Sequence, residues 1–145
     1  MTRRLPTSDD YWRHVEELCR AFSVRLLVRP SMPPHAAHAG RCRRTGRPCI
    51  VIAPVTDDTT YAVALHELGH MLHPAGTFWL EVSAVKRRTG AYATLRDVRL
   101  TLEAERNAWA WARRMALDWT PAMAGVRRMC LGAYRQQARR FTGRA

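Results

Sequence analysis

Two histidines and a glutamate stand at a spacing that suits a metal-dependent hydrolase. His66, Glu67 and His70 form the pattern His-Glu-x-x-His. On an α-helix, residues four apart lie on one face, so the two histidines can bind one ion from that face. Imidazole suits zinc, which accepts a tetrahedral site with one position left for water. Glu67 points about 100° away from His66, which is a suitable position for a general base that reaches the water.

The pattern needs a helix, and the surrounding residues predict one. Residues 57–60, Asp-Asp-Thr-Thr, offer N-cap candidates, and residues 61–73 contain no proline and are rich in Ala and Leu. Pro74 then ends the segment. Gly69 costs about 1 kcal/mol relative to alanine inside a helix, so we expect a close approach there by another backbone or by the metal loop. The alternative is a chance match on a core helix.

A zinc site needs a third protein ligand, and several residues compete for this role. We favour Glu103, because Asn107 lies one turn further on and can orient a ligating histidine. Glu105 points to nearly the opposite side of the same helix, so only one of the two glutamates can be the ligand. Glu81 and His73 are further candidates. We expect His73 to support the site rather than to bind the ion, because it lies two turns from the first histidine.

Two segments of the chain resemble one known family. Residues 66–73, His-Glu-Leu-Gly-His-Met-Leu-His, and residues 103–110, Glu-Ala-Glu-Arg-Asn-Ala-Trp-Ala, are similar to the two motifs of the ImmA/IrrE-like metallopeptidases. Arg106 stands where that family has Ala, and Trp109 where it has Phe. The resemblance implies a gluzincin-type zinc site with Glu67 as the catalyst and with His66, His70 and Glu103 as ligands. It also implies a protein substrate, often a DNA-binding repressor of the helix-turn-helix type.

Length, composition and charge predict the number of domains, the location and the kind of partner. A chain of 145 residues, 47% of them hydrophobic, predicts a single domain over 1–145. The resemblance implies that this is a zincin-like metallopeptidase domain. No apolar run reaches about 18 residues, and the N-terminus lacks the apolar core of a signal peptide, so we expect a cytoplasmic protein without membrane contact. The net charge of +12 favours acidic partners and allows weak, salt-sensitive attraction to nucleic acid.

The periodicity of the chain predicts an α+β fold, with a small three-stranded, mainly antiparallel sheet packed on helices. We expect the helices and strands at these residues: helices over 8–22, 61–73, 77–88, 95–119 and 121–141, and strands over 23–29 and on both sides of a turn. Thr45 and Gly46 form a plausible two-residue hairpin turn. Such a turn places Cys42 opposite Cys49, and we expect both thiols to be reduced.

The function that this pattern predicts is a zinc metalloprotease with one zinc per chain. Glu67 would take a proton from water and pass it to the leaving amine. Two other classes stay open, namely a zincin-fold adaptor that binds a partner without cleaving it and a basic nucleic-acid-associated factor. The intact motif favours the enzyme, because a binding-only scaffold has no chemical need for Glu67. The sequence does not predict the oligomeric state.

Overall fold

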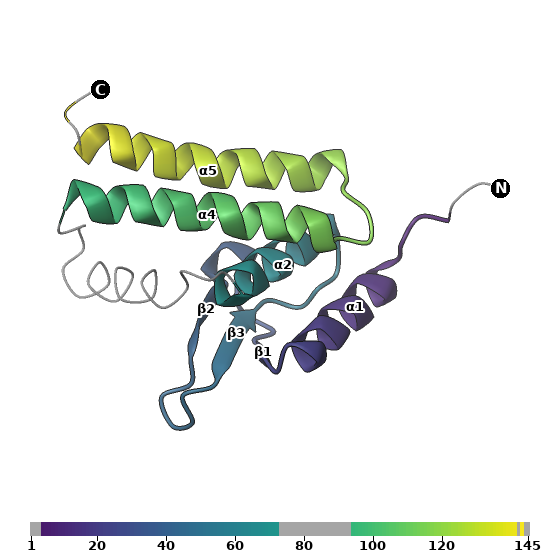
Figure 1. Ribbon diagram of the computed structural model, residues 1–145. Coiled ribbons are helices and arrows are strands. Elements are labelled where there is room, and N and C mark those ends of the chain that lie inside the picture. The colour runs from purple at the N-terminus through teal and green to yellow at the C-terminus, as the bar shows by residue number, and fades with distance from the viewer. Residues whose placement is uncertain (1–3, 73–93, 142, 144–145) are drawn as a thin grey trace.

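Helices and a small sheet build the part of the chain that the computed structural model describes, residues 4–72, 94–141 and 143 (Figure 1). The elements are, in chain order, α1 (Ser8–Ala21), β1 (Arg25–Val28), the short 3-10 helix η1 (Pro34–Ala36), β2 (His38–Arg41), β3 (Pro48–Ile52), α2 (Asp58–Leu72), α4 (Leu95–Met115) and α5 (Pro121–Phe141). The predicted α+β class is confirmed. The helix expected over 77–88 lies outside the described residues.

The sheet has the strand order β1-β3-β2 and is mixed. Strand β3 pairs with β2 in the antiparallel direction, with Gly40 opposite Cys49, and with β1 in the parallel direction, with Arg25 opposite Cys49. The prediction of a mainly antiparallel sheet is therefore wrong for one of the two pairings. The reason is the path of the chain, which leaves β1, forms the far edge as β2 and returns as the middle strand β3.

The turn between β2 and β3 is longer than predicted. The backbone N–H of Cys42 donates to the carbonyl of Arg47 at 2.9 Å, so residues 43–46 form the loop. A two-residue turn at Thr45-Gly46 of the common hairpin type requires positive φ at both residues, but only Gly46 adopts it, with φ 67°. Cys49 consequently pairs with Gly40, and the prediction that Cys42 lies directly opposite Cys49 is wrong. Both cysteines are free thiols.

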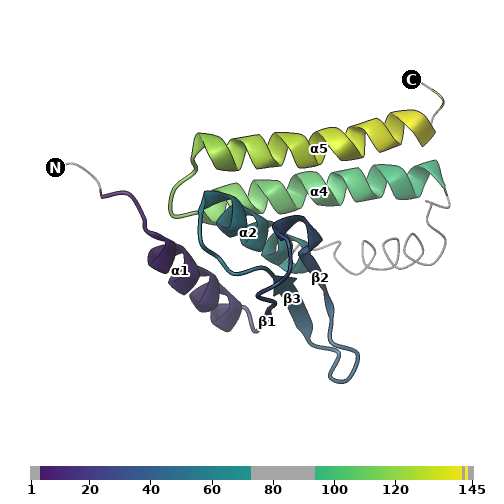
Figure 2. The same cartoon turned by 180° about the vertical axis from the view of Figure 1, so that it is seen from behind.

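Helix α2 occupies the centre of the molecule. It lies between the sheet on one side and the side-by-side helices α4 and α5 on the other, and α1 packs against it and against β1 (Figures 1 and 2). The core accordingly combines Ile50 and Ile52 of β3 with Leu65 and Leu68 of α2 and Trp109 of α4, all almost completely buried. None of the helices in the described residues is long and apolar enough to span a membrane.

The ends of the helices follow from capping side chains. Thr94 and Asp97 form a reciprocal capping box at the start of α4. Helix α1 begins at Ser8, as predicted, and Thr7 caps it, because the Thr7 side chain accepts a hydrogen bond from the Asp10 N–H. Helix α4 ends at Met115 rather than near residue 119, because the next residue is extended.

Candidate metal centre

Helix α2 carries the His-Glu-x-x-His pattern, and its start is fixed by a reciprocal pair of hydrogen bonds. The carboxylate of Asp57 accepts from the Thr60 N–H at 2.8 Å, and the Thr60 hydroxyl accepts from the Asp57 N–H at 3.1 Å. Such a pair satisfies N–H groups that the first turn of a helix leaves without partners. The helix predicted over 61–73 is thereby confirmed over its described part, and it brings both histidines to one face.

Gly69 allows α2 and α4 to approach each other closely. A Cβ atom on Gly69 would lie 2.5 Å from the carbonyl oxygen and 2.8 Å from the Cα of Ala108, closer than packed atoms can come. The buried residues of α4 include the small Ala104, Ala108 and Ala112 together with Glu105 and Trp109. The expected backbone approach at Gly69 is thus confirmed, and it places a glutamate of α4 against the histidines of α2.

Three buried side chains form a cluster at this crossing. The Nε2 atoms of His66 and His70 lie 2.9 and 3.0 Å from the two carboxylate oxygens of Glu105. Each side chain offers one potential ligand atom, and these three atoms lie within 4.8 Å of one another. The residues are 8%, 2% and 1% exposed, respectively. Two imidazoles and one carboxylate, converging from two helices, form a donor set that can hold a metal ion.

Glu105, and not Glu103, is the carboxylate beside the histidines. Glu103 is exposed, because two residues along a helix correspond to a rotation of about 200°. The structure therefore contradicts the choice of Glu103 as the third ligand and favours its competitor. Asn107 is half-buried, and no hydrogen bond within the described residues joins it to the cluster. The other two candidates, His73 and Glu81, lie outside the described residues.

Opposite charges hold the cluster together. Burial alone would lower the pKa of His66, but the carboxylates of Glu105 and Glu67 outweigh this effect and raise the pKa to about 9. Burial also opposes the ionisation of Glu105, yet its hydrogen bonds with His66 and His70 hold the pKa of this carboxyl well below its ordinary value. An ionised carboxylate is thus buried at the centre of the site, and it requires positive charge beside it, from protons or from a metal cation.

Glu67 lies on the other side of His66. Its Oε1 atom is 3.3 Å from Nδ1 of His66, whereas Nε2 of the same ring faces Glu105. Glu67 is only 7% exposed and is not one of the three converging donors. Two chemical roles fit this position. The carboxylate can act as a general base beside the metal, or it can orient the imidazole through the nitrogen that faces away from Glu105.

Two neighbours of the site were not predicted to have a role in it. The indole of Trp109 stacks on His66, with ring centroids 4.3 Å apart and planes 14° from parallel, and its ring nitrogen has no hydrogen-bond partner in the described part of the chain. The available signal was its position four residues after Glu105 on one helix face. Burial raises the pKa of Cys130 on α5, and the charges of Glu105 and Glu67 raise it further. No local pattern indicates this proximity.

The resemblance to the ImmA/IrrE-like metallopeptidases rests on two short motifs. No protein-family model, curated protein or solved structure matches the chain. Membership of that family therefore stays a prediction, and so does a zincin-like architecture. The chemistry of the buried cluster at the crossing of α2 and α4 is the firmest basis for a functional hypothesis, because it depends on interatomic distances within this chain.

Proposed function

We propose that the chain is a zinc-dependent endopeptidase whose metal is held by His66, His70 and Glu105. The observation that carries this proposal is the convergence of these three buried donors, within 4.8 Å of one another, next to the carboxylate of Glu67. Two histidines and a glutamate leave one of four positions open on zinc, which is typical of catalytic rather than structural sites. When bound, zinc supplies a Lewis acid and lowers the pKa of water to near neutrality.

In this proposal, Glu67 and Trp109 have different roles at the metal. Glu67 takes a proton from the attacking water and delivers it to the leaving amine. Trp109 stacks on His66, so the plane of the imidazole that would bind the metal is held in one orientation. The substrate is a protein segment, and the resemblance to the ImmA/IrrE-like family favours a regulatory protein of the repressor type. A cytoplasmic location belongs to the same proposal.

A second candidate function is that of a metal-containing adaptor that binds its partner without cleaving it. The observation that favours it is the 3.3 Å contact between Glu67 and Nδ1 of His66. A carboxylate in this position orients a metal ligand, and this role does not require catalysis. The two functions differ in what they require of Glu67, namely a base in the enzyme and only a hydrogen-bond acceptor in the adaptor.

The test is the substitution Glu67→Gln, which keeps the size of the side chain and an oxygen that accepts from His66 but removes the base. We expect zinc content and thermal stability to be retained and cleavage to fall by about 10²–10⁴-fold, the usual contribution of a general base. Cleavage is measured by co-expressing the chain with a candidate regulator encoded beside it and following truncation of that regulator. Glu103→Gln on the exposed face of α4 is the matched control.

Each other outcome has a defined meaning. If Glu67→Gln cleaves the regulator as fast as the unaltered chain, Glu67 is not the base and the proposed mechanism is wrong. If Glu67→Gln loses both zinc and cleavage while Glu103→Gln keeps both, Glu67 acts by orienting His66. If the unaltered, zinc-loaded chain binds the regulator without truncating it, the adaptor function replaces the proposed one.

A further inference from the structure

One long stretch of the chain contains no acidic residue. Residues 18–56 include neither Asp nor Glu but hold a series of arginines, namely Arg20, Arg25, Arg29, Arg41, Arg43, Arg44 and Arg47. The stretch comprises the end of α1, the whole sheet and the β2–β3 hairpin. None of these arginines forms an ion pair with a carboxylate in the described residues. The positive charge of this region is therefore available to an anionic partner.

Part of this charge surrounds a pocket between the end of α1 and the hairpin. The pocket has a volume of about 490 Å³, and three guanidinium groups line it, those of Arg20, Arg25 and Arg47. The hydroxyl residues Ser23 and Thr45 also line it, and no carboxylate is among its lining residues. Guanidinium and hydroxyl groups are the side chains that bind phosphate oxygens most readily. The pocket thus has the chemistry of a phosphate site.

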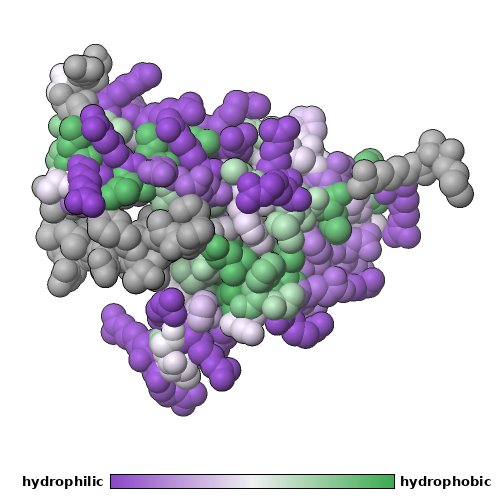
Figure 3. All heavy atoms as spheres, viewed as in Figure 1, coloured by the Kyte–Doolittle hydropathy of each residue, from purple (hydrophilic) through white to green (hydrophobic). Residues whose placement is uncertain are grey.

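The hairpin extends this charge away from the body of the protein. In both views of the ribbon, β2 and β3 project beyond the helices, with the turn at the far end (Figures 1 and 2). The residues at the turn are exposed, and purple, hydrophilic spheres surround a paler patch at this projecting end in Figure 3. Arg41 stiffens the turn, because its guanidinium donates to the carbonyl of Gly46 at 3.0 Å. A two-stranded ribbon of this kind has the width that the major groove of duplex DNA admits.

We propose that the pocket and the hairpin form a binding site for the phosphate backbone of a nucleic acid duplex. A duplex presents phosphates at regular intervals, so Arg25 and Arg47 in the pocket and Arg43 and Arg44 at the turn can each meet a phosphate. Contacts of this kind position a protein on a duplex without selecting a base sequence. The site is separate from the cluster at the crossing of α2 and α4, and it does not depend on the metal chemistry proposed above.

The surface favours a nucleic acid over an acidic protein as the partner. Protein interfaces usually contain aromatic or aliphatic anchors near their centre. Among the described residues between 18 and 56, the one large hydrophobic side chain that is exposed is Phe22, and its ring contacts that of Trp111 on α4. The same observation favours a duplex over a single strand, because single strands bind by stacking their bases on aromatic rings. What remains on this surface is charge and hydroxyl groups, which match a phosphate backbone.

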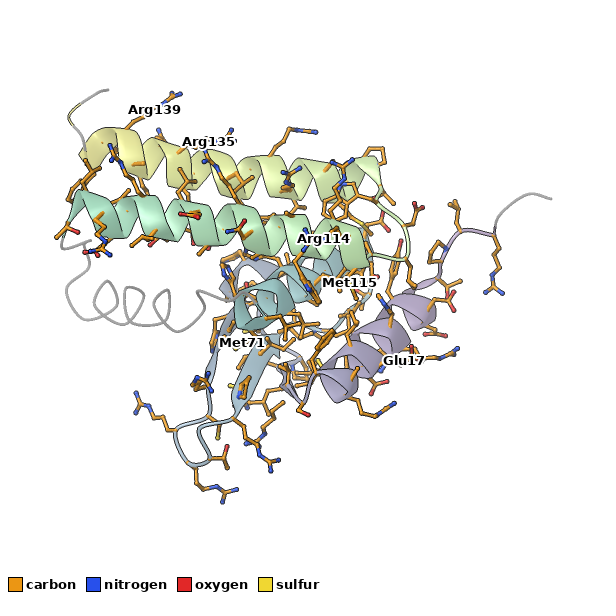
Figure 4. All side chains as sticks on the ribbon, in the orientation of Figure 1. Glu17, Met71, Arg114, Met115, Arg135 and Arg139 are labelled. Atoms are coloured by element: carbon orange, nitrogen blue, oxygen red, sulfur yellow. The ribbon has the colours of Figure 1, made fainter. Side chains whose placement is uncertain are left out.

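Helix α5 offers a matched comparison. Residues 119–145 also contain no acidic residue, and Arg128 and Arg135 are exposed there. Figure 4 shows Arg135 on α5, and both ribbon views place α5 at the opposite side of the molecule from the hairpin. Removing two arginines from either place lowers the net charge equally. A difference between the two pairs therefore reports a local site rather than the overall field of the protein.

The experiment measures fluorescence anisotropy of a labelled 20-base-pair DNA duplex, a length chosen to span roughly two helical turns, with the full chain and increasing NaCl. We compare the unaltered chain, Arg25→Ser/Arg47→Ser and the control Arg128→Ser/Arg135→Ser. Circular dichroism verifies that each variant is folded. Arg43→Ser/Arg44→Ser at the exposed turn is the second test pair, and it provides the same comparison if the first pair does not fold.

We expect Arg25→Ser/Arg47→Ser to weaken binding by about 10–100-fold near 0.1 M salt, because each phosphate contact contributes a salt slope of about 0.9. The slope itself should become shallower by about 2, while the α5 pair should change affinity by less than about threefold. Equal losses in both pairs would overturn the proposal, because the effect would then come from net charge. A polyglutamate peptide that competes as well as unlabelled duplex would overturn it too, in favour of an acidic protein partner.

Discussion

Charged groups are buried and paired at the α2–α4 crossing, whereas they are exposed to solvent at the β2–β3 hairpin. At the crossing, the carboxylate of Glu105 is 1% exposed, and each of its oxygens meets an imidazole. In the hairpin, the arginines are exposed and no carboxylate stands beside them. Burial makes an unpaired charge too costly to keep, whereas water solvates an exposed one at little cost. The candidate metal centre therefore depends on the packing of α2 against α4, whereas the basic surface depends on the absence of acidic residues between residues 18 and 56.

The cysteines show the same contrast within one residue type. At the hairpin, hydrogen bonds from the side chain and backbone of Thr45 and from the backbone of Arg44, together with the guanidinium of Arg25 at 3.6 Å, lower the pKa of Cys42 to about 7. In the core, burial raises the pKa of Cys19 to about 11. Hydrogen-bond donors around a sulfur stabilise its thiolate, and an apolar environment destabilises it.

The largest effect that follows from this contrast is a difference in thiol reactivity. At pH 7 we expect iodoacetamide to alkylate Cys42 faster than Cys19 by roughly a hundredfold, after allowing for the lower intrinsic nucleophilicity of a low-pKa thiolate. Peptide mass spectrometry over time measures both rates. Because only the thiolate reacts, the Cys42 rate should fall as the pH decreases below about 7.

The control for this prediction is Thr45→Val, which removes the hydroxyl donor but keeps the β-branched shape. This variant should shift the pH midpoint of Cys42 alkylation upward and leave Cys19 unchanged. If Cys19 reacts as fast as Cys42 at pH 7, the two environments do not differ as described. If Thr45→Val leaves the midpoint in place, the hydrogen bonds at the turn are not its cause.

A smaller effect concerns the stability change when an alanine replaces a glycine at the α2–α4 crossing or on α5. Gly69→Ala should destabilise the fold by about 2 kcal/mol, the usual cost of overpacking, because the added methyl group meets the backbone of Ala108. Gly132→Ala on α5 is the matched control, since nothing lies within 4 Å of its added Cβ. That substitution should stabilise the helix by up to about 1 kcal/mol. Urea unfolding measures both changes.

The same pair of variants links packing to the candidate metal centre. If α2 and α4 must touch at Gly69, then Gly69→Ala should also reduce zinc content, and Gly132→Ala should retain it. Gly69→Ala with the stability and zinc content of the unaltered chain would show that close contact between the helices is not what brings Glu105 to the histidines.

Local signals predict the elements of this fold well. Thr94 and Pro121 mark the starts of α4 and α5, and α5 runs to Phe141 as expected. Capping and proline geometry act within a few residues, so they can be recognised in one sequence. The parallel pairing of β1 with β3 could not be predicted in this way, because it depends on where the returning strand inserts in three dimensions.

The third ligand was mispredicted for a related reason. The position of Asn107 favoured Glu103, but the buried residues of α4 include Ala104, Ala108 and Ala112 together with Glu105 and Trp109. Alanines give only a weak hydrophobic signal, although they are the residues that close helix packing at Gly69 requires. Among the larger side chains, Trp109 marks this face, because it lies one turn after Glu105. Glu105 shares the alanine face, and Glu103 does not.

Metal content of the two glutamate variants tests the central claim most directly. Purified unaltered chain, Glu105→Ala and Glu103→Ala are each dialysed against zinc and then buffer, and bound metal is counted by elemental analysis. We expect close to one zinc per chain for the unaltered protein and for Glu103→Ala, and almost none for Glu105→Ala, because Glu105, and not Glu103, lies with His66 and His70. Retention of zinc by Glu105→Ala together with its loss from Glu103→Ala would contradict the site described here.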